Sequence, residues 1–420
     1  MTLIVNKFAF LLFLLKKKAP SGMLFWQQGC FRSWTLGLRP FWNPFNLIRI
    51  IPAEGAFMKL SFFSLDSISS WVVIFFLVVT QVNAGENEKK APQPELVVYA
   101  YDSLVAKHGL GPEIFPIFEK QCGCHVKVLP SGDGGQLLSR LQLDAERGKP
   151  GAQVVIGLDQ HLWDRAKNLI EPWGNWKPRG FEKVEADYRV GKNGDGFLPF
   201  DYGVFAFMAD ELGLKKSKLE TPKKILDLLA PEWKRNIILE DPRTSTPGLA
   251  FLLYVESVFG ERAESKVEDF WKKLSTQWLT LAPGWDGAYG LFLRQEAPLV
   301  WSYTTSQAYH VEHGDTQGRY KAVLFEEGQP IQIEGAALVK NSFKDEASRS
   351  RAQAFLEFLI SPEVQNRIPK TNWMLPVLKG TPLPVSFQKL PQPKKIYRIE
   401  SNAAQVTRSL GKWSHTVSAR

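Results

Sequence analysis

The sequence contains few of the residues from which metal and thiol sites are built, with 3 Cys and 6 His among 420 residues. A structural zinc site takes four Cys or His ligands in closely spaced pairs, and Cys122 and Cys124 have no second Cys pair to complete one. The sequence also lacks a Gly-x-Ser-x-Gly elbow, a Walker loop and a His-Glu-x-x-His helix. These absences favour a protein that binds its ligand without converting it, so we expect no catalytic residue, no metal and no cofactor.

Apolar runs long enough for a membrane anchor are missing too. The run Trp71–Thr80 is roughly half of the ~20 residues that a transmembrane helix needs. It follows Lys59 and precedes the small residues of "VNA", which is the pattern of a secretory signal peptide. We therefore expect a signal peptide over residues 58–84, cleaved after Ala84, and a mature protein in the periplasm.

The N-terminal region also accounts for most of the net positive charge. Residues 1–84 hold 8 of the 52 basic and 2 of the 43 acidic residues, which leaves 44 basic against 41 acidic residues in the rest. This near-balance gives no reason to expect a nucleic-acid partner. Residues 1–57 are interpreted as an upstream extension from a mis-assigned start, and the charged segment 85–94 as a disordered tether.

The two cysteines of the mature chain lie in "KQCGCHVKV". An exported chain meets an oxidising compartment, so a disulfide between Cys122 and Cys124 is plausible, although its ring would be small and strained. A reduced thiol pair and half of a metal site remain the alternatives.

Strand and helix patterns alternate after residue 95. Apolar strands are expected over 95–104, from His125 and over 152–159, with helices over 111–124 and 135–148 between them. This order predicts right-handed crossovers and a mostly parallel sheet, with the ligand beyond the carboxyl ends of the strands. The polar and aromatic residues just past those ends are Tyr101, Asp102, Asp133 and Asp159.

A second unit begins near residues 196–210, where helical segments become more frequent. Strand segments near 197–204 and 299–305 suggest a chain that crosses between two α/β lobes and returns. A gap between hinged lobes is a natural place for a small ligand. The expected organisation is lobe 1 over 95–198 and 306–380, lobe 2 over 199–305, and a C-terminal helical segment over 381–420 packing on the lobes.

Aromatic residues at loop positions are candidates for a ligand site. They are Tyr101, Trp285, Tyr303, Tyr309 and Trp373. Aromatic faces attract cations and stack on flat heterocycles. Inter-lobe packing is the alternative for each residue alone, whereas the set together favours ligand contact.

The segment "EDPRTSTPGLAFLLYVESVFG", residues 240–260, starts a helix with hydroxyl side chains and a proline. It is either an ordinary N-cap or an anion-binding helix entrance. Asp133 in "SGDGG" either caps the next helix or offsets a cationic ligand. Arg243 is expected to pair with nearby carboxylates, and the "YTTS" run 303–306 either caps a helix or offers a second hydrogen-bonding edge.

Several of these segments resemble, in order and spacing, the periplasmic thiamine-binding proteins of bacterial ABC importers. They are "VVYAYDSL", "GDGGQLLSRL", "PFDYGVFAF", "EDPRTSTPGL", "GWDGAYGLFL", "SYTTSQAYH" and "TNWMLPV". The resemblance extends from about residue 95 to the C-terminus. It implies an α/β, two-lobe periplasmic-binding-protein (type II) fold, with a mostly parallel sheet in each lobe, flanking helices and hinge strands.

The resemblance also implies a set of site residues. Its thiamine contacts fall on Asp133, Gly134, Ser245, Thr246, Trp285, Tyr303, Thr304, Thr305 and Ser306, and its aromatic cleft walls on Tyr101, Tyr309 and Trp373. A thiazolium cation suits the aromatic faces, and a hydroxyl or phosphate tail suits the helix entrance "TSTPG". His108 stands where a close relative has Trp, which puts the preference among thiamine and its phosphates in question.

The implied function is capture of thiamine, thiamine monophosphate or thiamine diphosphate, and delivery to an inner-membrane ABC permease by a monomer. Two alternatives stay open. A thiaminase-like enzyme of the same fold would use a cysteine nucleophile, and a ferric-ion receptor of the same superfamily would use adjacent tyrosines.

Overall fold

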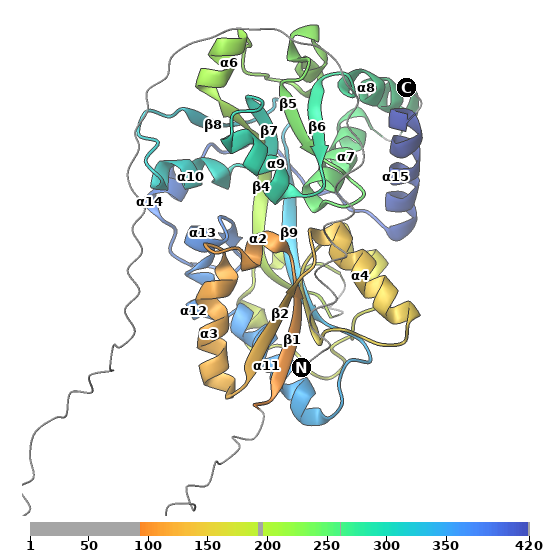
Figure 1. The fold of residues 1–420 in the computed structure, drawn as a ribbon, viewed down its shortest axis with the longest axis vertical. Coiled ribbons are helices and arrows are strands. Elements are labelled where there is room, and N and C mark those ends of the chain that lie inside the picture. The colour runs from red at the N-terminus through yellow and green to blue at the C-terminus, as the bar shows by residue number, and fades with distance from the viewer. Residues whose placement is uncertain (1–92, 192–195, 261, 419–420) are drawn as a thin grey trace, which may run out of the picture. The chain divides into compact units, whose positions relative to one another are not determined.

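The computed structural model describes residues 93–418, apart from 192–195 and 261 (Figure 1). The expected upstream extension, the signal peptide and all but the end of the tether lie outside the described residues. In the part of the chain that is described, no helix combines the length and the apolar character needed to span a bilayer.

The first sheet begins with three parallel strands in the spatial order β2-β1-β3. Their bounds are β1 Glu95–Ala100, β2 His125–Pro130 and β3 Val154–Asp159. Every residue of β3 is buried, as expected for a central parallel strand covered on both faces. The helices of this part are α2 Asp102–Val105, α3 Leu110–Cys122, α4 Gly134–Glu146, α5 Trp163–Ala166 and α11 Glu346–Leu359.

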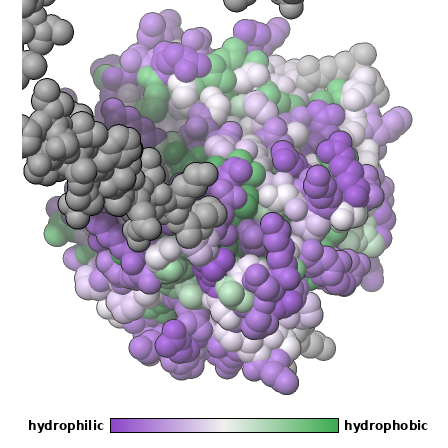
Figure 2. Space-filling model, turned by 60° about the horizontal axis from the view of Figure 1, so that its bottom comes forward, coloured by the Kyte–Doolittle hydropathy of each residue, from purple (hydrophilic) through white to green (hydrophobic). Residues whose placement is uncertain are grey.

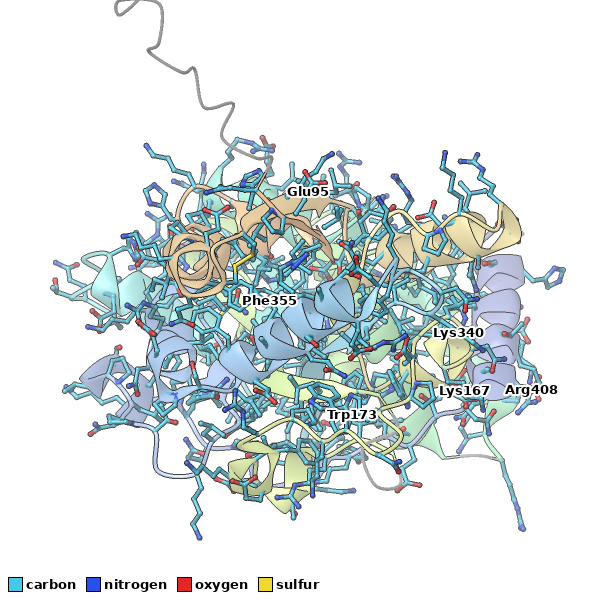
Figure 3. The ribbon with its side chains drawn as sticks, turned by 90° about the horizontal axis from the view of Figure 1, so that it is seen from below. Glu95, Lys167, Trp173, Lys340, Phe355 and Arg408 are labelled. Carbon is cyan, nitrogen blue, oxygen red and sulfur yellow. A yellow bond between two sulfur atoms is a disulfide. The ribbon has the colours of Figure 1, made fainter. Side chains whose placement is uncertain are left out.

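Helix α3 shows why these segments fold as they do. Ile114, Phe115 and Phe118 recur at helical spacing on its buried face. Gly123, with φ 59°, takes the left-handed conformation that ends the helix. Phe118 packs edge-on against Phe355 of α11, with ring centroids 4.9 Å apart. Figure 3 shows α11 and Phe355 on the underside of the molecule.

Two long antiparallel strands connect the first sheet to the second. They are β9 Gln329–Leu338 and β4 Leu198–Asp210. β9 lies between β3 and β4. The first part of β4, up to Val204, pairs with β9, and the part from Phe205 onward pairs with the second sheet. Figure 1 shows β4 and β9 running between the lower and the upper group of elements.

The second sheet has the spatial order β4-β7-β5-β6, with β8 also paired to β4. Its further strands are β5 Ile237–Glu240, β6 Trp278–Ala282, β7 Leu299–Tyr303 and β8 Tyr320–Val323. Its helices are α6 Glu211–Ser217, α7 Thr246–Phe259, α8 Glu264–Leu274, α9 Trp285–Leu293 and α10 Thr305–Glu312. Helix α7 is buried along its first ten residues, so its N-terminus lies inside the molecule.

Short elements complete the chain. The C-terminal ones are α12 Pro362–Gln365, α13 Ile368–Thr371, β10 Leu375–Pro376, α14 Val385–Gln388, β11 Ile396–Tyr397 and α15 Ala403–Ser418. The 3-10 helices are Phe181–Lys183, Ala186–Tyr188, Ile225–Leu229 and Pro231–Trp233. α15 packs on α7 and α8, where Ser409 donates to Glu256 at 2.8 Å and Lys412 pairs with Glu264 at 2.7 Å.

The crossings differ from the expectation in one respect. The sequence predicts the return crossing near 299–305, whereas β9 makes it in the structure. The segment 299–303 forms β7, which pairs with β4 only beyond Val204 and with β5, so it lies wholly in the second sheet. α10 and β8, which the sequence analysis assigned to lobe 1, contact β4 of the second sheet.

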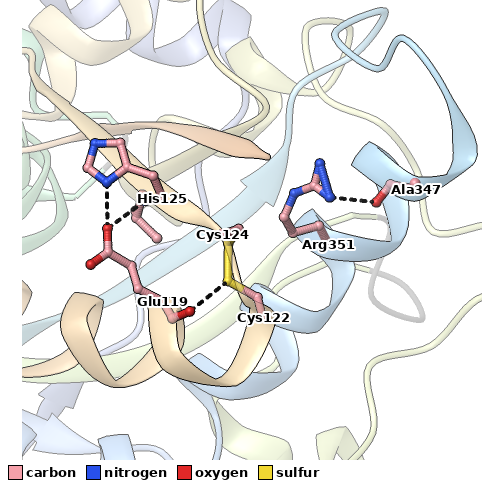
Figure 4. Close-up of a disulfide and its surroundings, with 7 residues drawn as sticks. Glu119, Cys122, Cys124, His125, Ala347 and Arg351 are labelled. Atoms are coloured by element: carbon pink, nitrogen blue, oxygen red, sulfur yellow. Dashed lines mark hydrogen bonds and ion pairs between the residues drawn. A yellow bond between two sulfur atoms is a disulfide. The ribbon is translucent and has the colours of Figure 1, made fainter. Parts of the chain in front are cut away.

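The plausible disulfide between Cys122 and Cys124 is confirmed (Figure 4). It joins the end of α3 to the start of β2. Glu119 reinforces this junction because its Oε1 accepts a hydrogen bond from the backbone N of Val126 at 2.8 Å and contacts Nδ1 of His125 at 2.8 Å. The bond therefore belongs to the amino end of β2, opposite the carboxyl ends of the parallel strands.

The molecular surface is polar on the face shown in Figure 2. Where the described residues form this face, hydrophobic residues occur in small patches separated by hydrophilic ones. This part of the surface therefore gives no sign of a broad apolar docking area.

Candidate functional site

The N-termini of three helices meet at Asp133. Helix α4 follows a strand of the first sheet, and α7 and α9 follow strands of the second. Asp133 is the N-cap of α4, and its Oδ1 accepts from the backbone N of Gly134 at 2.6 Å. Gln136 completes a capping box by accepting from the backbone N of Asp133 at 3.0 Å. The expectation that Asp133 caps a helix is confirmed.

The same carboxylate also binds the N-termini of α7 and α9. Its Oδ2 accepts from Oγ of Ser245 at 3.0 Å and from the backbone N of Trp285 at 3.1 Å. Its Oδ1 accepts from Oγ1 of Thr246 at 3.0 Å. Helix N-termini carry partial positive charge, so three of them favour a carboxylate at this point.

The N-cap interpretation of the segment 240–260 is confirmed, whereas binding of a ligand anion at this entrance stays a prediction. Ser245 caps α7, since its Oγ accepts from the backbone N of Gly248 at 3.4 Å. The entrance also holds an anion, which is the carboxylate of Asp133. Arg243 pairs with Asp241 at 2.5 Å, as expected for a structural partner of a nearby carboxylate.

The contact between the two helix starts is close enough to require glycine. A Cβ added at Gly134 would lie 2.3 Å from Cγ2 of Thr246. The starts of α4 and α7 therefore meet without room for a side chain between them.

Three predicted aromatic residues are joined through a fourth, Tyr289, that was not predicted. The ring of Trp285 stacks on Tyr289, with centroids 4.8 Å apart and an interplanar angle of 17°. Tyr289 meets Tyr309 edge-on at 6.5 Å, and Tyr309 meets Trp373 edge-on at 5.1 Å. Tyr289 lies four residues after Trp285 on α9, and this spacing is the signal that would have found it.

Hydrogen bonds orient the tryptophan at one end of this row. Nε1 of Trp285 donates to Oγ of Ser302 at 2.8 Å. Ser302 in turn lies 2.8 Å from Oγ of Ser306, a predicted site residue at the start of α10. The ring of Trp285 is thus fixed by stacking on one side and by a hydrogen bond at its edge.

The two other predicted tyrosines are buried. The ring of Tyr101 packs on Gly157, whose φ of 107° suits glycine and where a Cβ would lie 2.1 Å from the ring. Tyr303 stacks on Phe205 with centroids 4.7 Å apart. Tyr303 is thus packed in the sheets, in line with the alternative of ordinary inter-lobe packing.

The predicted threonines at the start of α10 are buried as well. The backbone N of Thr304 donates to the carbonyl O of Val204 at 2.8 Å, and its side chain makes no cap bond. Oγ1 of Thr305 has no hydrogen-bond partner among the described residues. His108 is exposed between α2 and α3.

Three carboxyl groups align across the strands that link the sheets. Asp159 of β3 and Asp201 of β4 are both paired in register with Glu334 of β9. Asp159 was noted in the sequence as lying past a strand end, whereas the other two were missed. The signal was a carboxylate inside an apolar strand, in "PFDYGV" and "IQIEGAAL".

Burial changes the protonation of these groups. It raises the pKa of Glu334 to about 8, with Asp133 and Asp159 adding repulsion. It raises the pKa of Asp159 to about 7. The pKa of Asp201 lies well above its usual value because of burial and the neighbouring Glu334. Burial likewise raises the pKa of Glu240, at the end of β5, well above its ordinary value.

The described residues contain no group of three or more His, Cys, Asp or Glu side chains arranged to hold a metal ion. Two surface pockets, of about 880 and 690 Å³, lie around Glu182–Arg189 and around Phe118–Cys122. Neither is lined by a predicted site residue. Four of the predicted residues instead meet at the helix starts, where Asp133 contacts Ser245, Thr246 and Trp285.

Comparison with known proteins is consistent with this architecture. A family model for bacterial extracellular solute-binding proteins matches residues 155–403. The thiamine-binding periplasmic protein of Brucella abortus biovar 1 (strain 9-941) is 41% identical over 302 residues, which covers 72% of this chain and 85% of the relative. That of Escherichia coli (strain K12) is 40% identical over 329 residues, covering 78% and 94%.

A solved structure of a periplasmic thiamin binding protein matches with a TM-score of 0.65 and 38% identity, over 77% of this chain and 96% of that one. These matches confirm the α/β, two-lobe fold expected from the sequence. The family model covers more than half of the chain, and identities near 40% extend over most of the relatives. The chain therefore belongs to the bacterial extracellular solute-binding proteins.

Proposed function

We propose that this protein is a periplasmic receptor that captures thiamine between two lobes and delivers it to an inner-membrane ABC permease. The relatives at about 40% identity are named thiamine-binding periplasmic proteins. In this proposal the two sheets are the cores of the two lobes, and β4 and β9 form the hinge.

The observation that carries the proposal is the meeting of aromatic rings and acidic groups where the sheets join. Trp285, Tyr309 and Trp373 supply aromatic faces, and Asp133 supplies a carboxylate that accepts a hydrogen bond from the backbone N of Trp285. Thiamine has a flat aminopyrimidine that can stack and a permanently cationic thiazolium that aromatic faces and carboxylates attract. Thiamine monophosphate and thiamine diphosphate belong to the proposed ligands too.

The geometry gives little support to an enzyme with a cysteine nucleophile. Cys122 and Cys124 are bonded to each other at the amino end of β2. Asp133 follows the carboxyl end of that strand, and six residues of strand span about 20 Å. We therefore propose that the protein binds thiamine without cleaving it, which incubation with thiamine and a nucleophile tests through release of free pyrimidine.

Isothermal titration of the exported protein with thiamine, thiamine monophosphate and thiamine diphosphate tests the proposal. We expect tight binding, and identification of thiamine by mass spectrometry in protein purified from rich medium. Millimolar or absent binding of all three ligands would contradict the proposal. A visible charge-transfer colour with ferric salt would instead favour the ferric-ion alternative.

A further inference from the structure

The buried carboxyl groups of the linking strands have a common feature that the proposed function does not use. Side chains at paired positions of neighbouring strands lie on the same face of a sheet. Asp159, Glu334 and Asp201 occupy paired positions on β3, β9 and β4. Three acids therefore lie side by side on the two strands that connect the lobes and on their neighbour.

Each of these acids keeps one oxygen without a hydrogen-bond partner among the described residues. These oxygens are Oδ2 of Asp159, Oδ1 of Asp201 and Oε2 of Glu334. None of the three residues takes part in an ion pair with a described Lys, Arg or His. A buried carboxylate with one unpartnered oxygen and no cation beside it is costly, so a proton or an external cation must offset its charge.

Glu334 is the least buried member of the row. Asp159 and Asp201 are 0% exposed, whereas Glu334 is 7% exposed. Of the three acids, Glu334 is therefore the one that a ligand from outside can reach.

Two amide side chains connect this row to the predicted aromatic residues. Tyr303 donates to Oε1 of Gln332 at 2.8 Å, and Nε2 of Gln332 donates to Oε1 of Glu334 at 2.7 Å. On the other side, Nδ2 of Asn372 donates to Oδ2 of Asp201 at 2.5 Å and to the hydroxyl of Tyr101 at 2.8 Å. Asn372 directly precedes Trp373, so the acids are tied to three of the predicted aromatic residues.

Building on the proposed function, we propose that the Glu334–Asp201 pair is the counter-charge for the cationic ligand and that ligand capture is coupled to proton release. In the free protein the pair holds a proton. When the cation binds, the O–H bond of the carboxyl group breaks, the carboxylate remains beside the cation, and the proton passes to solvent.

The groups around the pair determine whether ligand binding releases a proton or takes one up. The titratable groups that face Glu334 are Asp201 from β4, Asp159 from β3, Asp133 from the start of α4 and Tyr101 after β1. From β7 it is faced by Tyr303, whose pKa Glu334 helps to raise. Burial and hydrogen bonds from Tyr101 and Asp201 act in opposite directions: burial raises the pKa of Glu334 most, the charges of Asp133 and Asp159 raise it further, and the two hydrogen bonds lower it, so that it stands at about 8.

A ligand cation lowers that pKa, so binding at neutral pH releases a proton and becomes tighter as the pH rises. The affinity should increase by up to about tenfold per pH unit below pH 8 and level off above it.

Calorimetric titration of the wild-type protein with thiamine in two buffers of different ionisation enthalpy measures the number of protons released. At pH 7 we expect between about half and one proton released per thiamine. The pyrimidine half of thiamine, which lacks the quaternary nitrogen, should bind with no release. Proton uptake, or thiamine binding without any change in protonation, would overturn the inference.

Glu334→Gln keeps the size of the side chain and removes the titrating group. We expect this variant to release no proton, to bind thiamine with an affinity that is constant between pH 6 and 8, and to bind about tenfold more weakly than wild type at pH 8. Asp144→Asn is the matched control, because Asp144 is also buried but bonds to Tyr99 and to the backbone of Gly151. The control should release protons as wild type does.

The outcomes separate this inference from the proposed function. Proton release that persists in Glu334→Gln would overturn the inference and leave thiamine binding intact. Absence of thiamine binding at every pH would overturn the proposed function itself. If Glu334→Gln does not fold, two measurements on the wild type still test whether thiamine binding releases a proton. They are the pH dependence of the affinity and the comparison of thiamine with its pyrimidine half.

Discussion

At the scale of single residues, Asp133 combines two roles that usually fall to different side chains. It caps α4, and it accepts hydrogen bonds from the starts of α7 and α9. The positive ends of three helices are thereby directed at one carboxylate. A ligand at this point meets a carboxylate already stabilised by the protein, which suits a cation better than an anion.

The first prediction concerns Trp285, whose ring is fixed by Tyr289 and Ser302. Trp285→Ala should weaken thiamine binding by about 1–3 kcal/mol, because a cation–π contact and stacking area are lost together. Trp285→Phe keeps an aromatic face and should lose less of the affinity for thiamine. Calorimetric titration measures both variants, and an unchanged affinity in Trp285→Ala would remove this residue from the site.

Residue types at element ends could be predicted from the sequence, whereas hydrogen-bond partners across the fold could not. Asp133 and Trp285 stand out because each follows a strand and starts a helix. Asn372 and Gln332 are ordinary amides in the sequence, and their roles depend on contacts with residues as distant as Tyr101. Such contacts depend on the pairing of β4 with β9, which no local pattern encodes.

At the scale of elements, the meeting of the α4 and α7 starts sets how closely the two lobes approach. Gly134→Ala places a Cβ against Cγ2 of Thr246, at 2.3 Å in the present arrangement. We expect weaker thiamine binding, by roughly 1–3 kcal/mol as for other overpacked contacts. We also expect some loss of stability, because the same Cβ would lie 3.0 Å from the carbonyl O of Gly157 and 3.1 Å from Cδ1 of Leu162. Calorimetric titration measures the affinity for thiamine, and urea unfolding measures the free energy of unfolding.

Two variants control this experiment. Thr246→Ser removes Cγ2 and retains the hydroxyl that donates to Asp133, so it should restore binding when combined with Gly134→Ala. Gly411→Ala in α15 adds a methyl group where no atom lies within 4 Å, and it should leave binding unchanged. Normal affinity in Gly134→Ala would show that the ligand does not require this contact.

The junction of α3 and β2 gives a prediction about stability alone. The Cys122–Cys124 disulfide closes a loop of three residues, and replacing both cysteines by serine should destabilise the fold by about 1–2 kcal/mol. Because β2 separates the bond from Asp133, thiamine affinity should not change. Urea unfolding of the variant, and of wild type with and without reductant, measures the loss. A parallel loss of thiamine binding would contradict this separation.

The crossing strands show where a prediction at this scale fails. The alternation of apolar residues predicts strands at 197–204 and 299–305, and strands occur at both places. Which of them passes between sheets depends on its partners. β4 has thirteen residues and pairs with β9 and then with β7, while the five residues of β7 remain in one sheet.

At the scale of the whole molecule, the buried acids of the linking strands connect stability to ligand capture. Glu334 has a pKa of about 8 in the folded protein, above the ordinary value, so the folded state binds more protons than the unfolded state between these values. Stability contributed by this group is therefore complete at low pH and is lost as the pH rises through 8. The lowered pKa values of His161 and His310, about 4 in the fold because of burial, act in the opposite direction below about pH 7.

Between pH 7 and 8 the histidines are largely neutral in both states, so the acids dominate and the free energy of unfolding should fall by about 1 kcal/mol for Glu334 alone. Asp201 and Glu240, whose pKa values are raised well above normal by burial, add to the same trend. Urea unfolding followed by tryptophan fluorescence measures how the free energy of unfolding changes with pH, and this change should be smaller in Glu334→Gln. A midpoint that rises with pH in this window would mean that Glu334 is ionised in the ligand-free fold, and the coupling of thiamine capture to proton release would lose its physical basis.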